Sequence, residues 1–242
     1  MWRFALPLLL CTVAAFAAGD AAYEEPRDLS LNADGVERLT VQVAAGSLRI
    51  TGVAANDTIV AKALIRIPDA GAEEARRIIE EDLTLELVRD GEAARLEAQF
   101  KTGLFAGQSG SVALDVTVPQ RLALDVDDGS GPIEIEGVHG DIGIDDGSGP
   151  ITLRGSGGNV TIDDGSGALA AEDTGGDLAI DDGSGEITVR RVAGSVRIDD
   201  GSGDIIVSGV AGDLDIEEAG SGGVEVSDVG GEIRRGDSPG DR

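Results

Sequence analysis

One pentapeptide, Asp-Asp-Gly-Ser-Gly, recurs through the second half of the chain at a fixed spacing. It occupies 127–131, 145–149, 163–167, 181–185 and 199–203, so the copies follow one another with an 18-residue period. A sixth and degenerate copy, at 217–222, carries one inserted residue. Identical segments at one spacing indicate a repeat architecture, in which each unit stacks on its neighbours.

Each 18-residue unit divides into two halves of nine, and each half carries two apolar residues separated by one position. The first pairs are Ile133/Ile135, Ile151/Leu153, Leu169/Ala171, Ile187/Val189 and Ile205/Val207, and the second pairs are Ile142/Ile144, Val160/Ile162, Leu178/Ile180, Val196/Ile198 and Leu214/Ile216. Residues two apart on a strand point the same way, so each half predicts one short strand with its apolar pair directed inward.

These strands predict an all-β fold, a parallel β-solenoid of about six 18-residue coils over 127–235. Coils stacked about 4.8 Å apart would pair each strand with its equivalents above and below. An antiparallel meander of hairpins is the alternative. It would also align the apolar residues, but it does not explain why the sequence repeats every 18 residues rather than every nine.

The region at 36–126 is expected to be β-rich and to cap the solenoid. Its apolar residues alternate with polar ones, as in Leu39, Val41 and Val43, which is typical of strands with one buried face. One short helix is expected after Pro68, with Asp69 as its cap. The segment 23–35 is polar and predicts a linker, and 236–242 predicts a polar tail.

The segment 1–22 resembles a secretory signal peptide. Arg3 is followed by an apolar run from Phe4 to Ala18 that is too short to span a bilayer. Cleavage is expected after Ala17 or after Ala22. The sequence therefore predicts an exported protein, located in the periplasm, at the cell surface or in the medium.

Composition limits the partners of the mature chain. The formal net charge is −27, from 19 Lys and Arg against 46 Asp and Glu. Such a charge repels nucleic acid and anionic lipid, so neither is an expected partner. After signal removal no apolar stretch is long enough to span a membrane. The only cysteine, Cys11, is lost with the signal, so packing rather than disulfides must stabilise the chain.

The strand-rich lead-in, the stretch Val112–Pro119 and the Gly-Ser-Gly-Asp-Ile and Gly-Asp-Leu motifs resemble a bacterial family. Its members are exported β-strand-repeat proteins known as putative adhesins, with a domain of unknown function. The resemblance covers about 36–235 and implies an exported interaction protein with an extracellular or envelope partner. It supplies no catalytic residues and no cofactor.

The aspartate doublets depart from the looser pattern of that family. Stacking would align them as two ladders of like charge, Asp127, Asp145, Asp163, Asp181 and Asp199 beside Asp128, Asp146, Asp164, Asp182 and Asp200. Neighbouring carboxylates about 5 Å apart repel by roughly 1 kcal/mol even in water, so something must offset the repulsion. One explanation is that each Asp accepts hydrogen bonds from the amides of its own Gly-Ser-Gly turn. The other is a metal site, in which Ca²⁺ or another hard cation binds between rungs.

Catalysis has few candidates in this sequence. His139 is the only histidine and lies in a glycine turn, and no Ser-His-Asp grouping is present. We therefore expect no enzyme, but a structural or adhesion-type protein that presents an acidic surface. The alternative is a Ca²⁺-dependent β-helix that binds or cleaves polysaccharide, with Arg154, Arg190, Arg191 or Arg197 as its base.

Overall fold

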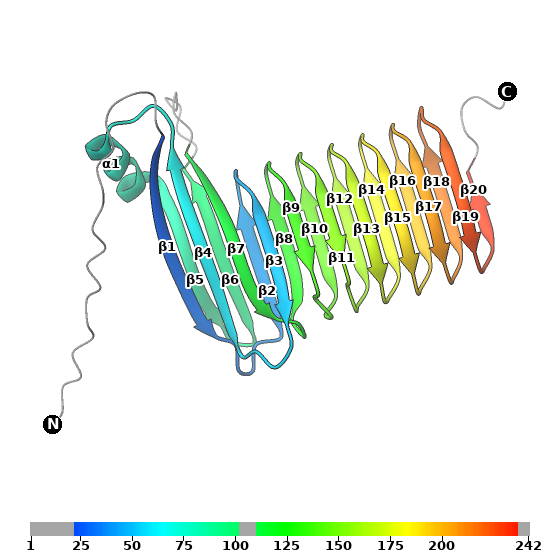
Figure 1. Cartoon of the computed structure of the whole chain (residues 1–242), viewed down its shortest axis with the longest axis horizontal. Coiled ribbons are helices and arrows are strands. Elements are labelled where there is room, and N and C mark those ends of the chain that lie inside the picture. The colour runs from blue at the N-terminus through cyan, green and yellow to red at the C-terminus, as the bar shows by residue number, and fades with distance from the viewer. Residues whose placement is uncertain (1–21, 102–109, 237–242) are drawn as a thin grey trace.

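The computed structural model describes residues 22–101 and 110–236, and within them the chain folds into twenty β-strands and one α-helix (Figure 1). The predicted signal peptide lies outside the described residues except for Ala22, and the predicted tail except for Gly236. The strands form two sheets of ten, here called sheet A and sheet B.

The repeat region contributes strands to the two sheets in turn. Sheet B receives β8 (Ala123–Asp128), β10 (Ile142–Asp146), β12 (Val160–Asp164), β14 (Leu178–Asp182), β16 (Val196–Asp200), β18 (Leu214–Ala219) and β20 (Ile233–Arg235). Sheet A receives β9 (Ile133–Glu136), β11 (Ile151–Arg154), β13 (Leu169–Thr174), β15 (Ile187–Val192), β17 (Ile205–Val210) and β19 (Val224–Val229).

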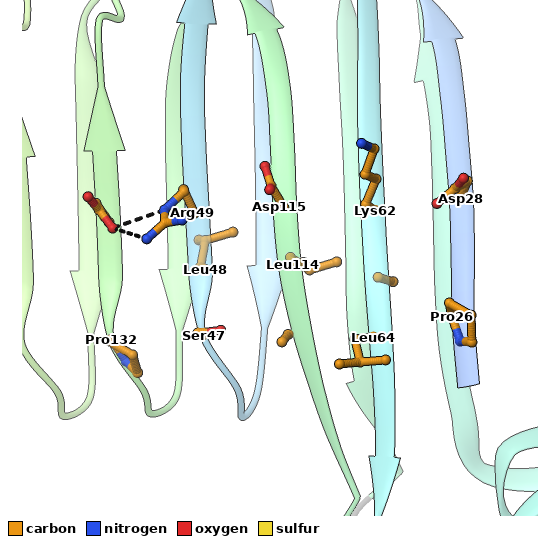
Figure 2. A pocket seen from close by; sticks show the side chains of 13 residues that line it. Pro26, Asp28, Ser47, Leu48, Arg49, Lys62, Leu64, Leu114, Asp115 and Pro132 are labelled. Carbon is orange, nitrogen blue, oxygen red and sulfur yellow. Dashed lines mark hydrogen bonds and ion pairs between the residues drawn. The ribbon is translucent and has the colours of Figure 1, made fainter. Parts of the chain in front are cut away.

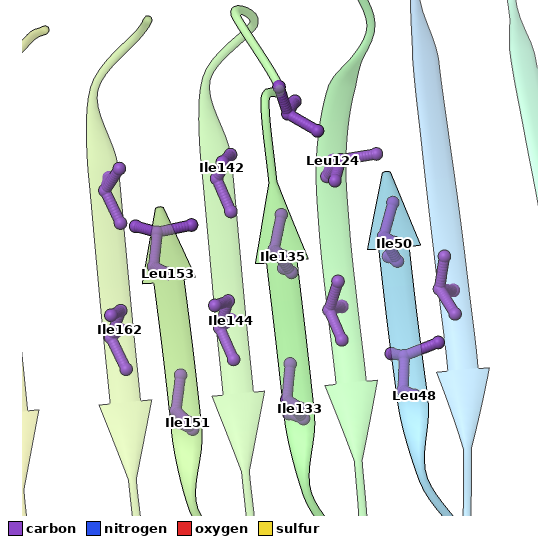
Figure 3. Close-up of a cluster of buried hydrophobic side chains, with 14 of the residues drawn as sticks. Leu48, Ile50, Leu124, Ile133, Ile135, Ile142, Ile144, Ile151, Leu153 and Ile162 are labelled. Atoms are coloured by element: carbon purple, nitrogen blue, oxygen red, sulfur yellow. The ribbon is translucent and has the colours of Figure 1, made fainter. Parts of the chain in front are cut away.

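Neighbouring strands of the repeat are parallel, and equivalent residues of successive units lie opposite each other. Ile142 pairs with Val160, and Ile151 pairs with Leu169. This pairing confirms a solenoid-like stack and contradicts the antiparallel meander. The apolar pairs predicted from the sequence are all buried, none more than 4% exposed. Figure 3 shows part of this core, with the pairs Ile133/Ile135, Ile142/Ile144 and Ile151/Leu153 stacked along neighbouring strands.

The first part of the chain is also β-rich. It comprises β1 (Tyr23–Asn32), β2 (Arg38–Val43), β3 (Leu48–Val53), β4 (Thr58–Ile67), α1 (Ala72–Asp82), β5 (Leu83–Asp90), β6 (Ala93–Phe100) and β7 (Ser111–Pro119). The helix begins after Gly71 rather than at Asp69, whose left-handed φ of 52° belongs to the turn out of β4. No helix in the described ranges is long and apolar enough to cross a membrane.

Two strands from this first part are rungs of the same parallel stacks as the repeat. β2 lies between β6 and β8 in sheet B, and β3 lies between β7 and β9 in sheet A, each parallel to both neighbours. Beyond them, β4 and β1 in sheet A and β5 in sheet B continue as antiparallel strands. The parallel stack therefore starts well before the first Asp-Asp-Gly-Ser-Gly.

The predicted linker at 23–35 was wrong for most of its length, because residues 23–32 form β1. This strand pairs with the whole of β4 and packs the side chains of Leu29 and Leu31 against the core. Glu24 and Asp28 lie on the opposite face of the strand, where Glu24 accepts two hydrogen bonds from Arg66 at 2.6 and 3.0 Å. Glu25 and Arg27 share the face of Leu29 and Leu31 and pair with each other at 2.9 Å. The segment looks polar in sequence because only every second residue has an apolar environment.

Candidate functional site

The two aspartates of each doublet face opposite sides of sheet B. The first residue of each doublet is directed to solvent, and we call these five the outer column: Asp127, Asp145, Asp163, Asp181 and Asp199. The second is buried, and we call these five the inner column: Asp128, Asp146, Asp164, Asp182 and Asp200. Within each column neighbouring residues are paired across parallel strands.

Each inner carboxyl caps its own turn with one oxygen. The Oδ1 atom of Asp182 accepts a hydrogen bond from the backbone N–H of Ser184 at 2.9 Å, and the other four make the same contact at 2.9–3.3 Å. The turn-capping prediction thus holds for the second aspartate of each doublet.

The other oxygen of each inner carboxyl has no partner. The five residues are at most 2% exposed. In each of them the Oδ2 atom is buried and forms no hydrogen bond. A buried polar atom without a partner is costly, because it has lost water and gained nothing in return. Five such atoms in consecutive rungs are unusual for a folded protein.

This environment raises the pKa of the inner carboxyls. Loss of water on burial is the main cause, and the hydrogen bond from the serine N–H opposes it. The pKa rises to about 6 for Asp128, Asp146 and Asp182, and it is raised for the same reason at Asp164 and Asp200.

The glycines explain why the Gly-Ser-Gly turn after each aspartate doublet has the same sequence in every full repeat. Gly149 and Gly167 have φ of 142° and 156°, a conformation that favours glycine. A Cβ atom on Gly167 would collide with the carbonyl oxygen of Gly149 in the preceding rung. The close stacking of backbones at this corner therefore excludes any side chain.

The inner column has apolar neighbours at both ends. Val43 of β2 pairs with Asp128, and Ala219 of β18 pairs with Asp200. The register shifts at this last pairing, which places the extra residue of the degenerate sixth copy in a β-bulge. The buried carboxyls are thus confined to the repeats that carry the full pentapeptide.

The outer column remains solvated and without a counter-charge. None of its five carboxylates forms an ion pair or a side-chain hydrogen bond with another described residue. A hollow of about 330 Å³ lies on this face where Gly143 has no side chain, with Asp127, Asp145 and Thr161 among its lining residues.

The described residues do not form a metal centre. No group of three or more His, Cys, Asp or Glu side chains in 22–101 and 110–236 is arranged to hold an ion. We therefore assign neither column as metal ligands, and Ca²⁺ binding stays a prediction. His139, the only histidine, is exposed in its turn, as expected.

A third column was missed by the sequence analysis. At position 15 of successive repeats a short polar side chain accepts a hydrogen bond from the backbone N–H of its equivalent in the next rung. Asn159 donates to Asp141 at 2.9 Å, and Asp177 donates to Asn159 at 3.0 Å. The same contact continues from Ser195 and Asp213 at 2.8 and 3.1 Å. The recurrence of Asp, Asn or Ser at this position was the available signal.

The arginines considered as catalytic bases are all paired with carboxylates. The ion pairs are Arg154–Glu134 at 3.6 Å, Arg190–Glu172 at 3.2 Å, Arg191–Asp173 at 2.6 Å and Arg197–Glu217 at 2.6 Å. Hydrogen bonding to Asp173 raises the pKa of Arg191 further above its ordinary value. Such an arginine holds its proton more firmly, which is the reverse of what a base requires.

A hollow of about 550 Å³ lies on the outer face of sheet A, where β1, β4 and β7 meet β3 and β9 (Figure 2). Charges alternate in sign across its five strands, in the order Asp28, Lys62, Asp115, Arg49 and Glu134. Arg49 donates to Glu134 Oε2 from Nε at 3.0 Å and from Nη2 at 2.6 Å. Opposite charges on neighbouring strands stabilise a sheet, so this row favours the observed strand order.

Comparison with known proteins gives similarity of structure only. Neither a family model nor a curated protein matches the sequence. Similar solved structures include a putative cell adhesion protein from Clostridium sporogenes, with 12% identity over 89% of this chain and 100% of that one and a TM-score of 0.33. Two putative adhesins, from Bacteroides fragilis and Parabacteroides distasonis, have 11% and 10% identity over 88% of this chain and 97% of theirs, with TM-scores of 0.40 and 0.38.

Proposed function

We propose that this chain is an exported, non-enzymatic interaction protein of the adhesion type, which presents an acidic β-solenoid surface to an extracellular or envelope partner. The observation that carries the proposal is the outer aspartate column. Its carboxylates are solvated and without counter-charges, whereas carboxylates on sheet A such as Glu134 and Asp173 are paired with arginines. A partner could therefore bind the outer column without first displacing a cation of the protein itself.

The rigidity of the stack supports the same proposal. Each rung is held to the next by backbone pairing and by the hydrogen bonds at position 15. The backbone positions that carry the outer carboxylates are thus held about 4.8 Å apart, which reduces the entropy lost when a partner binds several of them. The pairing of the four candidate arginines with carboxylates argues against the polysaccharide-cleaving alternative.

The test compares surface attachment by cells that lack the gene and are complemented with variants of the protein. One variant changes the five outer aspartates to Asn. Its matched control changes five exposed glutamates elsewhere to Gln: Glu37, Glu73, Glu80, Glu81 and Glu92. We expect the outer-column variant to lose attachment and the control to retain it, although both carry the same net charge.

Equal attachment by the two variants would contradict the proposal. Release of unsaturated products from a uronate polymer by the purified protein would replace it with an enzymatic function.

A further inference from the structure

We propose that the inner aspartate column is a proton-binding site: its carboxyls take up protons as the solenoid folds, so that the stack is more stable in mild acid than in mild alkali. Nothing in the proposed adhesion function requires this property, because that function depends on the outer column.

Each inner carboxyl has one oxygen without a partner. Oδ1 is satisfied by the serine N–H, but Oδ2 is buried without a hydrogen-bond partner in every full repeat. If all five carboxyls were ionised, the interior would hold five unneutralised charges in adjacent rungs. Such an arrangement is too costly to persist, so a positive species must accompany the column.

The charges that face the inner column are negative. The charged groups close enough to affect the inner carboxyls are other aspartates: the outer residue of the same doublet and the inner residues of adjacent rungs. No lysine, arginine or histidine is among them. The flanking strands contribute Val43 and Ala219, which carry no charge. The protein therefore supplies no cation of its own to neutralise the column.

The geometry beside the inner column favours a proton over a metal ion. A Ca²⁺ ion takes six to eight oxygens at about 2.3–2.6 Å, whereas each inner residue offers one free oxygen and successive rungs are about 4.8 Å apart. Neither of the two hollows described above is lined by an inner-column residue. A proton requires no cavity, and it removes the charge at the site where burial is most costly.

The direction of the pH effect follows from the folded and unfolded states. The pKa of Asp128, Asp146 and Asp182 is raised to about 6 in the folded chain, against about 3.9 for an unfolded aspartate. Between these values the folded state binds more protons than the unfolded state. The added stability is fully present below the unfolded pKa and is lost as the pH rises through about 6. Because neighbouring rungs interact, the column titrates as a unit over a broad range.

The experiment measures the thermal midpoint of the purified full chain between pH 8 and pH 5.5, first in chelator. Asp164→Asn removes one inner charge from the middle of the column and keeps the acceptor for Ser166. Asp163→Asn, on the same strand, removes one outer charge and is the matched control. We expect the unmodified protein to gain stability on acidification. Asp164→Asn should raise the midpoint at pH 8 by about 2–4 °C and reduce the pH dependence. Asp163→Asn removes only a neighbouring charge that acts on Asp164 and should change both quantities much less.

A midpoint that is flat or falls between pH 8 and pH 5.5 would overturn the proposal, and so would equal behaviour of the two variants. A second measurement covers the case in which Asp164→Asn does not fold. The carboxyl carbons of the unmodified protein are followed by NMR, and a set of aspartates titrating near pH 6 is the expected result. A rise in midpoint with millimolar Ca²⁺ at pH 8, present in the control and absent in Asp164→Asn, would show that the column binds metal instead.

Discussion

Asp173 and Arg191 occupy the same corner of successive repeats, and both have a left-handed backbone, with φ of 60° and 57°. Two hydrogen bonds join them, from Arg191 Nε to Asp173 Oδ1 at 2.6 Å and from Nη2 to Oδ2 at 2.9 Å. Other repeats have glycine at this corner, with φ of 66–71° at Gly137, Gly155 and Gly209. The side chains of Asp173 and Arg191 gain an ion pair at a position whose backbone favours glycine.

Replacing Arg191 separates these two effects. Arg191→Ala loses the ion pair and keeps the unfavourable backbone, whereas Arg191→Gly loses the pair and relieves the backbone. We expect the glycine variant to have the higher thermal midpoint of the two, by about 2–4 °C. Equal midpoints would mean that the left-handed conformation costs nothing at this corner.

Two substitutions at Asp182 distinguish the charge of the inner column from its hydrogen bond. Asp182→Asn keeps an oxygen that can accept from the Ser184 N–H, and Asp182→Ala does not. Both remove the buried charge. Asp182→Asn should therefore be more stable than Asp182→Ala by about 1 kcal/mol in urea unfolding at pH 8. If the alanine variant is the more stable, the turn does not depend on its cap.

Thr174 places a hydroxyl in a corner that valine fills in other repeats. Its Oγ1 is buried without a partner, while Val138, Val192 and Val210 occupy equivalent positions and are at most 1% exposed. Thr174→Val has nearly the same shape and removes the unsatisfied group, so we expect a gain of about 1 kcal/mol in the free energy of unfolding. The control is Thr161→Val, where the side chain is exposed and little change is expected. A loss of stability in Thr174→Val would indicate that a bound water satisfies the hydroxyl.

The close approach of backbones at the pentapeptide turn makes its last glycine sensitive to any added atom. Gly167→Ala would place a methyl group against the carbonyl of Gly149, and we expect it to cost about 2–3 kcal/mol or to prevent folding. Gly143→Ala is the control, because there the added atom would meet only Asp125 Oδ1 at 3.4 Å and the Leu124 carbonyl oxygen at 3.9 Å. Similar unfolding curves for the two variants would contradict the close packing at this corner.

The repeat itself could be predicted almost completely from the sequence, since its period and its apolar positions are regular. The opposite orientations of the two aspartates follow from the same alternation: Val126 is directed inward, so Asp127 is directed outward and Asp128 inward. The sequence-based prediction gave both residues the same environment, because a carboxylate is usually solvated. The regular pattern was a better guide than the chemistry of the individual residue.

The order of the strands β1 to β7 in the two sheets could not be predicted from a regular sequence pattern. β3 lies between β7 and β9, which come later in the chain, and nothing in the local pattern of Leu48 and Ile50 identifies those neighbours. The alternating charges across this region favour the observed order, but many other pairs of opposite charge are available in the sequence. Such long-range pairing depends on the whole chain and not on a local window.

This strand order has a consequence for synthesis of the chain. Within the repeat each strand pairs with its equivalent in the next unit, so those rungs can form soon after they are made. β3 cannot pair as soon as it is made, because Leu48 pairs with Leu114 on one side and with Ile133 on the other. Until both segments are available, β2 and β3 have open edges that could pair with other chains. Export of the chain in an unfolded state would postpone that hazard until every partner strand had crossed the membrane.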